Sequence, residues 1–229
     1  MSTFLRQLYE VIGCFSTETH IAICNDLLRK LKAKGDGHLA DIFADALKTN
    51  KTFSQIDCAF VPVGRKNDRG TNPVTMAMRR NDGLINVPRA STATYGFQFI
   101  QREIPHLRAK SLGEQEHKGW IDYIARTNER PILGEIKWKG DKNPFYAFIQ
   151  LLTYLSEMAT PNQIDRALKH QLFGKEISKL GAFDLHIFLA NFNGRGKKGQ
   201  LLALTHELAR AFKAKLKAVH PKAAECVGR

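Results

Sequence analysis

Three charged residues lie close together in two segments of the sequence that are rich in β-forming residues. Asp122 lies in residues 119–125 (GWIDYIA), and Glu135 and Lys137 lie in residues 131–139 (PILGEIKWK). A short polar segment, RTNE, separates the two. This arrangement predicts a β-hairpin that carries two carboxylates and one ammonium group.

The expected register of this hairpin brings the two carboxylates together. If the turn is centred between Asn128 and Glu129, opposed residues have position numbers that add to 257, so Asp122 faces Glu135. The Cβ atoms of directly opposed residues are about 4.5–5.5 Å apart. Two carboxylates at that distance repel each other unless a cation lies between them, so the pair predicts a site for a divalent metal ion.

Lys137 and Ile136 extend this predicted site. Because side chains alternate along a strand, Lys137 lies on the face of Glu135, whereas Ile136 points the other way and its carbonyl lies between them. Asp122, Glu135 and the Ile136 carbonyl are the oxygen ligands expected for Mg²⁺, with Mn²⁺ as a substitute. A metal ion acidifies a bound water, which Lys137 would orient or deprotonate for in-line attack on a phosphodiester. Alternatively, these are surface residues of an exposed hairpin, in ion pairs worth under about 1 kcal/mol.

The segment after the hairpin predicts a helix that starts at Asn143 and Pro144 and continues to Met158. Asparagine favours the N-cap position and proline favours the first helical position. Gln150 and Tyr154 are one helical turn apart on this helix, so their side chains are neighbours. The alternative for this pair is an ordinary half-buried helix flank.

The other elements follow from hydrophobic spacing and from glycine and proline. They are helices over 3–33, 38–47, 95–104 and 201–219, strands over 107–114 and 183–192, and an irregular basic stretch over 62–92. The nearly continuous apolar run 183–192 predicts a strand that is buried on both faces. Together these elements predict an α/β fold, bordering on α+β, with a central mixed sheet flanked by helices.

Three of these segments resemble the successive motifs of the PD-(D/E)XK nucleases. They are GWID (119–122), GEIK (134–137) and QLLTY (150–154). The sequence is most similar to the RecB-like and lambda-exonuclease-like branch, in which Q-x-x-x-Y follows the E-x-K strand. The resemblance covers roughly residues 95–192, and it implies a restriction-endonuclease-like core.

The resemblance also implies roles for individual residues. Asp122 and Glu135 match the metal-binding carboxylates, and Lys137 matches the catalytic lysine. Gln150 and Tyr154 match the pair that contacts substrate or supports the metal site. The implied activity is that of an Mg²⁺-dependent deoxyribonuclease acting on double-stranded or single-stranded DNA.

A further metal-binding glutamate is common in this branch, on a helix before the sheet. Glu103 is the first choice because it lies in the helix expected before the hairpin, although Pro105 weakens that helix. Glu114 and Glu116 are the alternatives. Ile121 stands where the motif often has proline, a departure that RecB-type sequences tolerate.

The resemblance divides the chain into an N-terminal helical extension with a basic loop, 1–90, and a nuclease-like core, 91–229. Three alternatives to this nuclease remain open at this point. The chain could be a site-specific restriction endonuclease, a catalytically inactive DNA-binding module on the same fold, or a basic scaffold protein such as an RNA-associated one.

Composition favours a soluble protein with a polyanionic partner. The net charge of +13 suits nucleic acid, because each neutralised phosphate releases counterions. No stretch approaches the roughly 20 apolar residues of a membrane span, and no secretory signal is evident, so we expect a cytoplasmic location and no membrane partner. The four cysteines lack the spacing of a zinc site. A homo-oligomer is compatible with the sequence.

Two basic segments near the C-terminus are ambiguous. GRGKKG (194–199) is either a solvated loop or a contact to a phosphate backbone. The cations of the last expected helix are interpreted as a solvated face: Arg210, Lys213, Lys215 and Lys217.

Overall fold

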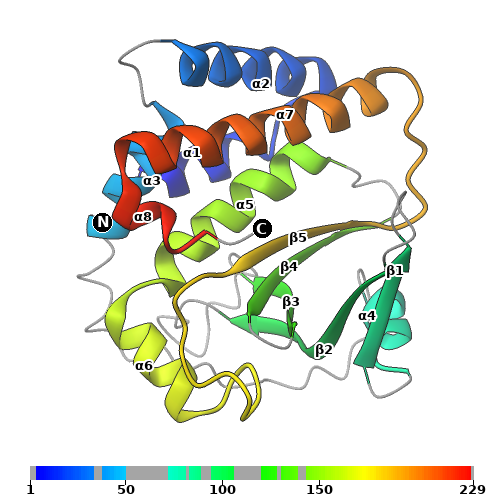
Figure 1. Ribbon diagram of the computed structural model, residues 1–229. Helices are drawn as coiled ribbons and strands as arrows, with labels where there is room; N and C mark the ends of the chain where they lie inside the picture. Colours follow the sequence, from blue (N-terminus) through cyan, green and yellow to red (C-terminus); the bar gives the residue numbers. More distant parts are fainter. Residues whose placement is uncertain are drawn as a thin grey trace, which may run out of the picture.

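The protein has a mixed α/β fold, in which helices flank a five-stranded sheet. The computed structural model describes residues 4–33, 38–49, 72–80, 83–88, 94–105, 120–127, 130–138 and 143–227. Most of the described helices gather in a layer on one side of the sheet (Figure 1). The predicted α/β class with a mixed, helix-flanked sheet is confirmed.

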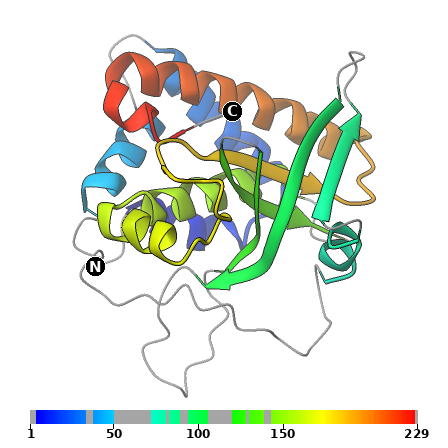
Figure 2. The ribbon, with the colours of Figure 1, turned by 60° about the horizontal axis from the view of Figure 1, so that its bottom comes forward.

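The sheet has the strand order β1-β2-β3-β4-β5. The pairs β1–β2, β2–β3 and β3–β4 are antiparallel, and β5 is parallel to β4. The sheet curls strongly (Figure 2), so the Tyr95 hydroxyl of β2 lies 3.0 Å from Nε2 of His186 on β5. The strands are β1 (Leu84–Pro88), β2 (Thr94–Pro105), β3 (Trp120–Arg126), β4 (Pro131–Lys137) and β5 (Asp184–Leu189).

Helix α5 (Pro144–Met158) is the central helix of the layer. Every one of its residues except Tyr146 is buried, as expected of a helix surrounded by other elements. It follows β4 and begins the connection to the parallel strand β5, which requires such a crossover. The other helices are α1 (Phe4–Ile12), α2 (Thr17–Lys32), α3 (Leu39–Thr49), α4 (Asn72–Met78), α6 (Pro161–Lys169), α7 (Gly196–Val219) and α8 (Pro221–Ala224).

Two hydrophobic clusters lie on opposite faces of the sheet. The larger cluster joins the helical layer to the sheet, with Leu5 and Phe43 from the N-terminal helices, Leu152 from α5 and Leu133 from β4. The smaller cluster fills the concave side of the curl, where α4 packs against residues of β2, β3 and β4. The hairpin β3–β4 therefore has one face toward α5 and one toward the second cluster.

The predicted helix over 95–104 is wrong, because these residues form most of β2. Hydrogen bonding to β1 on one side and β3 on the other satisfies the backbone of this segment. Phe97 and Phe99 both reach the second cluster, which is the two-residue period of a strand. Gly96 also weakens a helix at this position.

Three further predictions need correction. The stretch 62–92 is not irregular throughout, since α4 and β1 lie within it. The strand expected over 183–192 is not buried on both faces, because β5 lies at the edge of the sheet and only Asp184 of it is fully buried. The helical region 3–33 is broken before Ser16, whose hydroxyl caps α2 by accepting from the Thr19 amide.

Two helices differ from expectation in their extent. Helix α7 begins at Gly196, so most of GRGKKG forms its first turn rather than a loop. Helix α6 was not expected from the sequence. The strand expected over 107–114 lies outside the described residues. Among the described helices, none combines the length and apolar character required to cross a bilayer.

Candidate functional site

The β3–β4 hairpin has the register expected from the sequence. The pairs run from Tyr123↔Gly134 to Arg126↔Pro131, and their position numbers add to 257. The next position in this register places Asp122 opposite Glu135. Oδ2 of Asp122 accepts a hydrogen bond from the Ile136 amide at 2.8 Å, so its carboxylate lies against β4 beside Glu135.

Glu135 and Lys137 face the helical layer, whereas Ile136 faces the second cluster. The Glu135 and Lys137 side chains are almost fully enclosed, with exposed fractions of 2% and 3% for the two residues. This excludes the alternative in which they are solvated residues of an exposed hairpin. Asp122 is half-buried, so it lies nearer to solvent.

The Lys137 ammonium group has a defined set of neighbours. Its Nζ donates to Oε1 of Glu135 at 3.0 Å and to Oε1 of Gln150 at 3.2 Å. It also lies 4.9 Å from the centre of the Tyr146 ring, within the range of a cation–π interaction. These contacts hold the ammonium beside the carboxylate pair.

The Glu135 carboxyl is electrostatically unfavourable in its ionised form. Burial and the neighbouring Asp122 charge raise its pKa well above the usual range, while Lys137 acts in the opposite direction. Its Oε2 is buried and has no hydrogen-bond donor within the described part of the chain. Such an oxygen normally has a partner, and a cation next to Asp122 would supply one.

The chemistry of these donors fits magnesium. Asp122, Glu135 and the Ile136 carbonyl are oxygen ligands, and Mg²⁺ commonly takes one or two carboxylates and keeps several waters. Within the described part of the chain, no group of three or more His, Cys, Asp or Glu residues is placed to hold a metal ion. The candidate ligands among the described residues are thus two carboxylates and one carbonyl.

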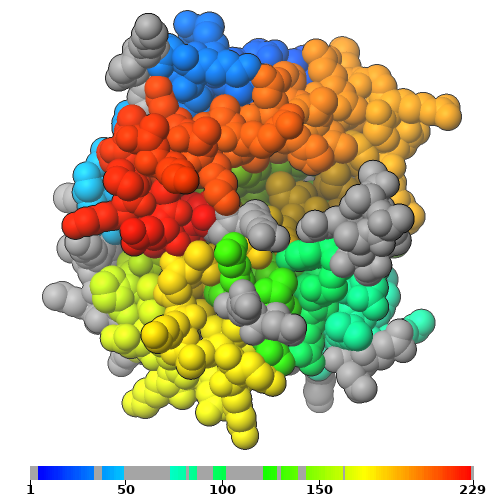
Figure 3. Space-filling model, in the orientation of Figure 1, coloured from blue at the N-terminus to red at the C-terminus, as the bar shows by residue number. Residues whose placement is uncertain are grey.

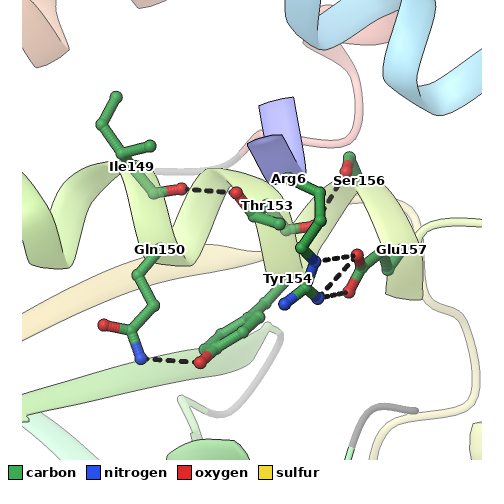
Figure 4. Close-up of polar contacts among 7 residues, drawn as sticks. All are labelled: Arg6, Ile149, Gln150, Thr153, Tyr154, Ser156 and Glu157. Carbon is green, nitrogen blue, oxygen red and sulfur yellow. Dashed lines mark hydrogen bonds and ion pairs between the residues drawn. The ribbon is translucent and has the colours of Figure 1, made fainter. Parts of the chain in front are cut away.

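Gln150 and Tyr154 are brought to the site by α5. Nε2 of Gln150 donates to the Tyr154 hydroxyl at 2.6 Å (Figure 4), while its Oε1 accepts from Lys137. The Gln150 amide therefore links the other two residues. Tyr154 is enclosed, and this burial raises its pKa well above the usual range, so its hydroxyl stays neutral.

Helix α1 also contributes to the surroundings of Lys137, which the sequence did not suggest. Tyr9 stacks on Tyr146, with ring centres 5.2 Å apart and planes 13° from parallel. One turn earlier in α1, Arg6 forms a bidentate ion pair with the Glu157 carboxylate of α5 (Figure 4). The only sequence signal was that Tyr146 lies one helical turn before Gln150 and so shares its face.

The start of α5 is fixed by Asn143, which caps the helix as predicted. Its Oδ1 accepts from the Tyr146 amide at 2.9 Å, and its Nδ2 lies 2.7 Å from Nδ1 of His20. The other ring nitrogen of His20 lies 2.7 Å from the Ile12 carbonyl. These bonds join the start of α5 to the connection between α1 and α2.

Gly134 is required behind the site because the Tyr123 ring covers it. A Cβ atom at this position would lie 2.0 Å from the Tyr123 Cζ atom. The glycine thus lets an aromatic ring pack directly on the β4 backbone, one residue before Glu135.

Glu103 lies on β2 and not on a helix, so that part of the prediction is wrong. Arg102 pairs with Tyr123 and Ile104 pairs with Ile121, which puts position 103 opposite position 122. Positions 103, 122 and 135 are therefore neighbouring backbone positions on three adjacent strands. The alternatives Glu114 and Glu116 lie outside the described residues.

His186 does not belong to the site. It lies opposite Gly134 on the far face of the sheet, where burial lowers its pKa to about 4.

Comparisons of the chain with protein-family models, with curated proteins and with solved structures found no match.

Proposed function

We propose that this protein is a magnesium-dependent nuclease that hydrolyses phosphodiester bonds in DNA, with a PD-(D/E)XK-type active site on a restriction-endonuclease-like core. The observation that carries the proposal is the buried Glu135 carboxylate. One of its oxygens bonds to Lys137, and the other, next to Asp122, has no hydrogen-bond donor among the residues that the structure describes. A structural ion pair would not need the second carboxylate.

In the proposed mechanism, Asp122, Glu135 and the Ile136 carbonyl would hold the metal ion. A bound Mg²⁺ supplies a Lewis acid that acidifies water and offsets negative charge on the phosphate. Lys137 orients the attacking water, because Glu135 and Gln150 fix its ammonium next to the carboxylates. The positive charge of Lys137 also stabilises the negative charge that develops on the phosphate oxygens in the transition state.

Gln150 acts on Lys137 directly in this mechanism, and Tyr154 acts through Gln150. A glutamine amide can turn its oxygen or its nitrogen toward Lys137, and only the oxygen accepts a hydrogen bond from an ammonium. The Lys137 ammonium group therefore selects the orientation with the oxygen toward it. The Tyr154 hydroxyl accepts a hydrogen bond from the Gln150 nitrogen that this orientation leaves, which holds the amide in place. Tyr154 is therefore proposed as a positioning residue.

The test is a cleavage panel with plasmid, linear duplex and single-stranded DNA, in Mg²⁺ or in EDTA. We expect cleavage only with Mg²⁺, and a loss of at least about 100-fold in Asp122→Asn, Glu135→Gln and Lys137→Met, as is typical when catalytic groups are removed. Asp165→Asn, an exposed change on α6, is the matched control and should retain activity.

Two outcomes of this panel would contradict the proposal. Binding of DNA without cleavage of any substrate would assign a non-catalytic DNA-binding role. Full activity in one of the three variants would remove that residue from the mechanism. Cleavage at one defined sequence would instead identify a site-specific restriction endonuclease.

A further inference from the structure

Helix α7 carries a large share of the positive charge of the protein. It has six lysine and arginine residues and one glutamate, so it contributes +5 of the net +13. Its inner face is apolar and buried, through Leu201, Leu208, Phe212 and Leu216. The charges therefore lie on the sides and the outer face of the helix.

The side of α7 that faces α2 is occupied by contacts within the protein. Glu207 pairs with Lys32 of α2, and Lys197 pairs with Glu18. Lys215 donates to the Ala33 carbonyl at 2.8 Å. These contacts join α7 to α2.

The outer face presents a row of basic residues. His206, Arg210, Lys213 and Lys217 follow one another at intervals of three or four residues, and all four are exposed. Such spacing places them on one side of the helix, and the row contains no acidic residue. Figure 3 shows α7, in orange and red, as a continuous band that is open across the upper part of this face. We call these four residues the α7 row.

We propose that the α7 row is a docking surface for the phosphate backbone of nucleic acid. At 1.5 Å per residue, the row spans about 16 Å, which equals the axial rise of about five nucleotides of one strand in B-form DNA. An anionic membrane surface is the less suitable partner, because the apolar face of α7 is already buried in the core and cannot insert. Nucleic acid requires only the charges that the row presents.

The proposal rests on the proposed function only in taking nucleic acid as the partner, and binding can be measured without cleavage. The experiment measures the affinity of a fluorescent 30-base-pair duplex in EDTA, between 50 and 200 mM salt. The variant Arg210→Gln/Lys213→Gln/Lys217→Gln is compared with the control Lys169→Gln/Lys175→Gln/Lys179→Gln, which removes three exposed charges at and after the end of α6. Both variants have the same net charge.

The α7 variant should lose most of the salt dependence that three phosphate contacts provide. The slope of log affinity against log salt should become shallower by about 2.7, so the affinity loss across this salt range should be about 40-fold smaller than in the wild type. The control should keep the wild-type slope. All six positions are exposed, so thermal unfolding should show that both variants are folded.

Three outcomes would overturn the proposal. The slopes of the two variants could be equal, which would assign the effect to net charge alone. The wild-type protein could fail to bind the duplex at 50 mM salt. The α7 variant could lose binding to vesicles that contain phosphatidylserine while its binding to DNA is unchanged, which would assign the row to a membrane surface. Each result is obtained even if the protein cleaves nothing.

Discussion

At the scale of single residues, the site combines two features that oppose folding and that one cation would relieve. The Glu135 carboxylate is buried beside Asp122, and none of the described residues donates a hydrogen bond to one of its oxygens. Uncompensated buried charge of this kind is costly. Lys137 compensates only part of it, because burial and Asp122 still raise the pKa of Glu135.

The raised pKa predicts how magnesium binding depends on pH. Without metal, the folded protein holds its proton on Glu135 more tightly than the unfolded chain does. The folded state therefore loses stability as pH rises from the ordinary pKa of 4.5 toward the raised value. Mg²⁺ needs the ionised form, so its affinity should rise with pH over the same interval.

The measurement is the shift in Tm on adding Mg²⁺ at pH 5 and at pH 8. When the Mg²⁺ concentration is a hundred times Kd, binding stabilises the folded state by about 2.7 kcal/mol. For a chain of this size, this corresponds to a rise in Tm of roughly 5–10 °C. The shift should be smaller at pH 5 and absent in Glu135→Gln. A shift of equal size at both pH values would mean that Glu135 is not a ligand.

A second prediction at this scale concerns the third carboxylate. Position 103 lies opposite position 122 in the register of β2 and β3. Glu103→Gln should therefore weaken magnesium binding and reduce cleavage by at least about 10-fold, as for other groups that support a metal site. Calorimetry on Glu103→Gln, Glu114→Gln and Glu116→Gln separates the three candidates. If one of the other two variants weakens binding and Glu103→Gln does not, the strand position is not the ligand.

At the scale of elements, local pairing was predictable from the sequence and distant pairing was not. The β3–β4 register follows from a short turn, and the cap of α5 follows from Asn143 and Pro144. Strand β2 was mistaken for a helix because its conformation depends on β1 and β3, and tertiary pairing overrides local propensity. The position of α1 beside Lys137 could not be predicted, since Tyr9 and Tyr146 are far apart in the sequence and neither belongs to a motif.

The ion pair between Arg6 and Glu157 should be the main polar anchor of α1. Both side chains are largely enclosed, with exposed fractions of 7% and 8%. Arg6→Ala would leave a buried carboxylate without its partner, so the free energy of unfolding should fall by about 3–5 kcal/mol. Denaturant unfolding measures this change.

The apolar pair Arg6→Met/Glu157→Met is the control for this anchor. It removes both charges together, so it should recover most of the stability lost in Arg6→Ala. A loss in Arg6→Ala below about 1 kcal/mol would be typical of a surface ion pair. That result would contradict the role of this pair as a buried anchor.

At the scale of the whole molecule, the N-terminal helices share one hydrophobic cluster with the helices that follow the hairpin. Leu5, Leu28 and Phe43 belong to the same buried cluster as Leu152 of α5 and Phe212 of α7. The three parallel helices α2, α5 and α7 begin on the same side of the molecule (Figure 1). The contacts of His20 with Asn143 and of Glu18 with Lys197 join these three helix starts.

This shared core predicts that residues 91–229 do not fold as a separate nuclease domain. Removing residues 1–90 would expose apolar side chains that each contribute about 1.5–3 kcal/mol when buried. Four or five such side chains match the whole stability of a typical domain, about 5–15 kcal/mol. The fragment 91–229 should therefore show no cooperative thermal transition by circular dichroism, whereas the full chain should show one. A cooperative transition in the fragment, together with Mg²⁺-dependent cleavage, would instead establish residue 90 as a true domain boundary and reduce α1 to an accessory helix.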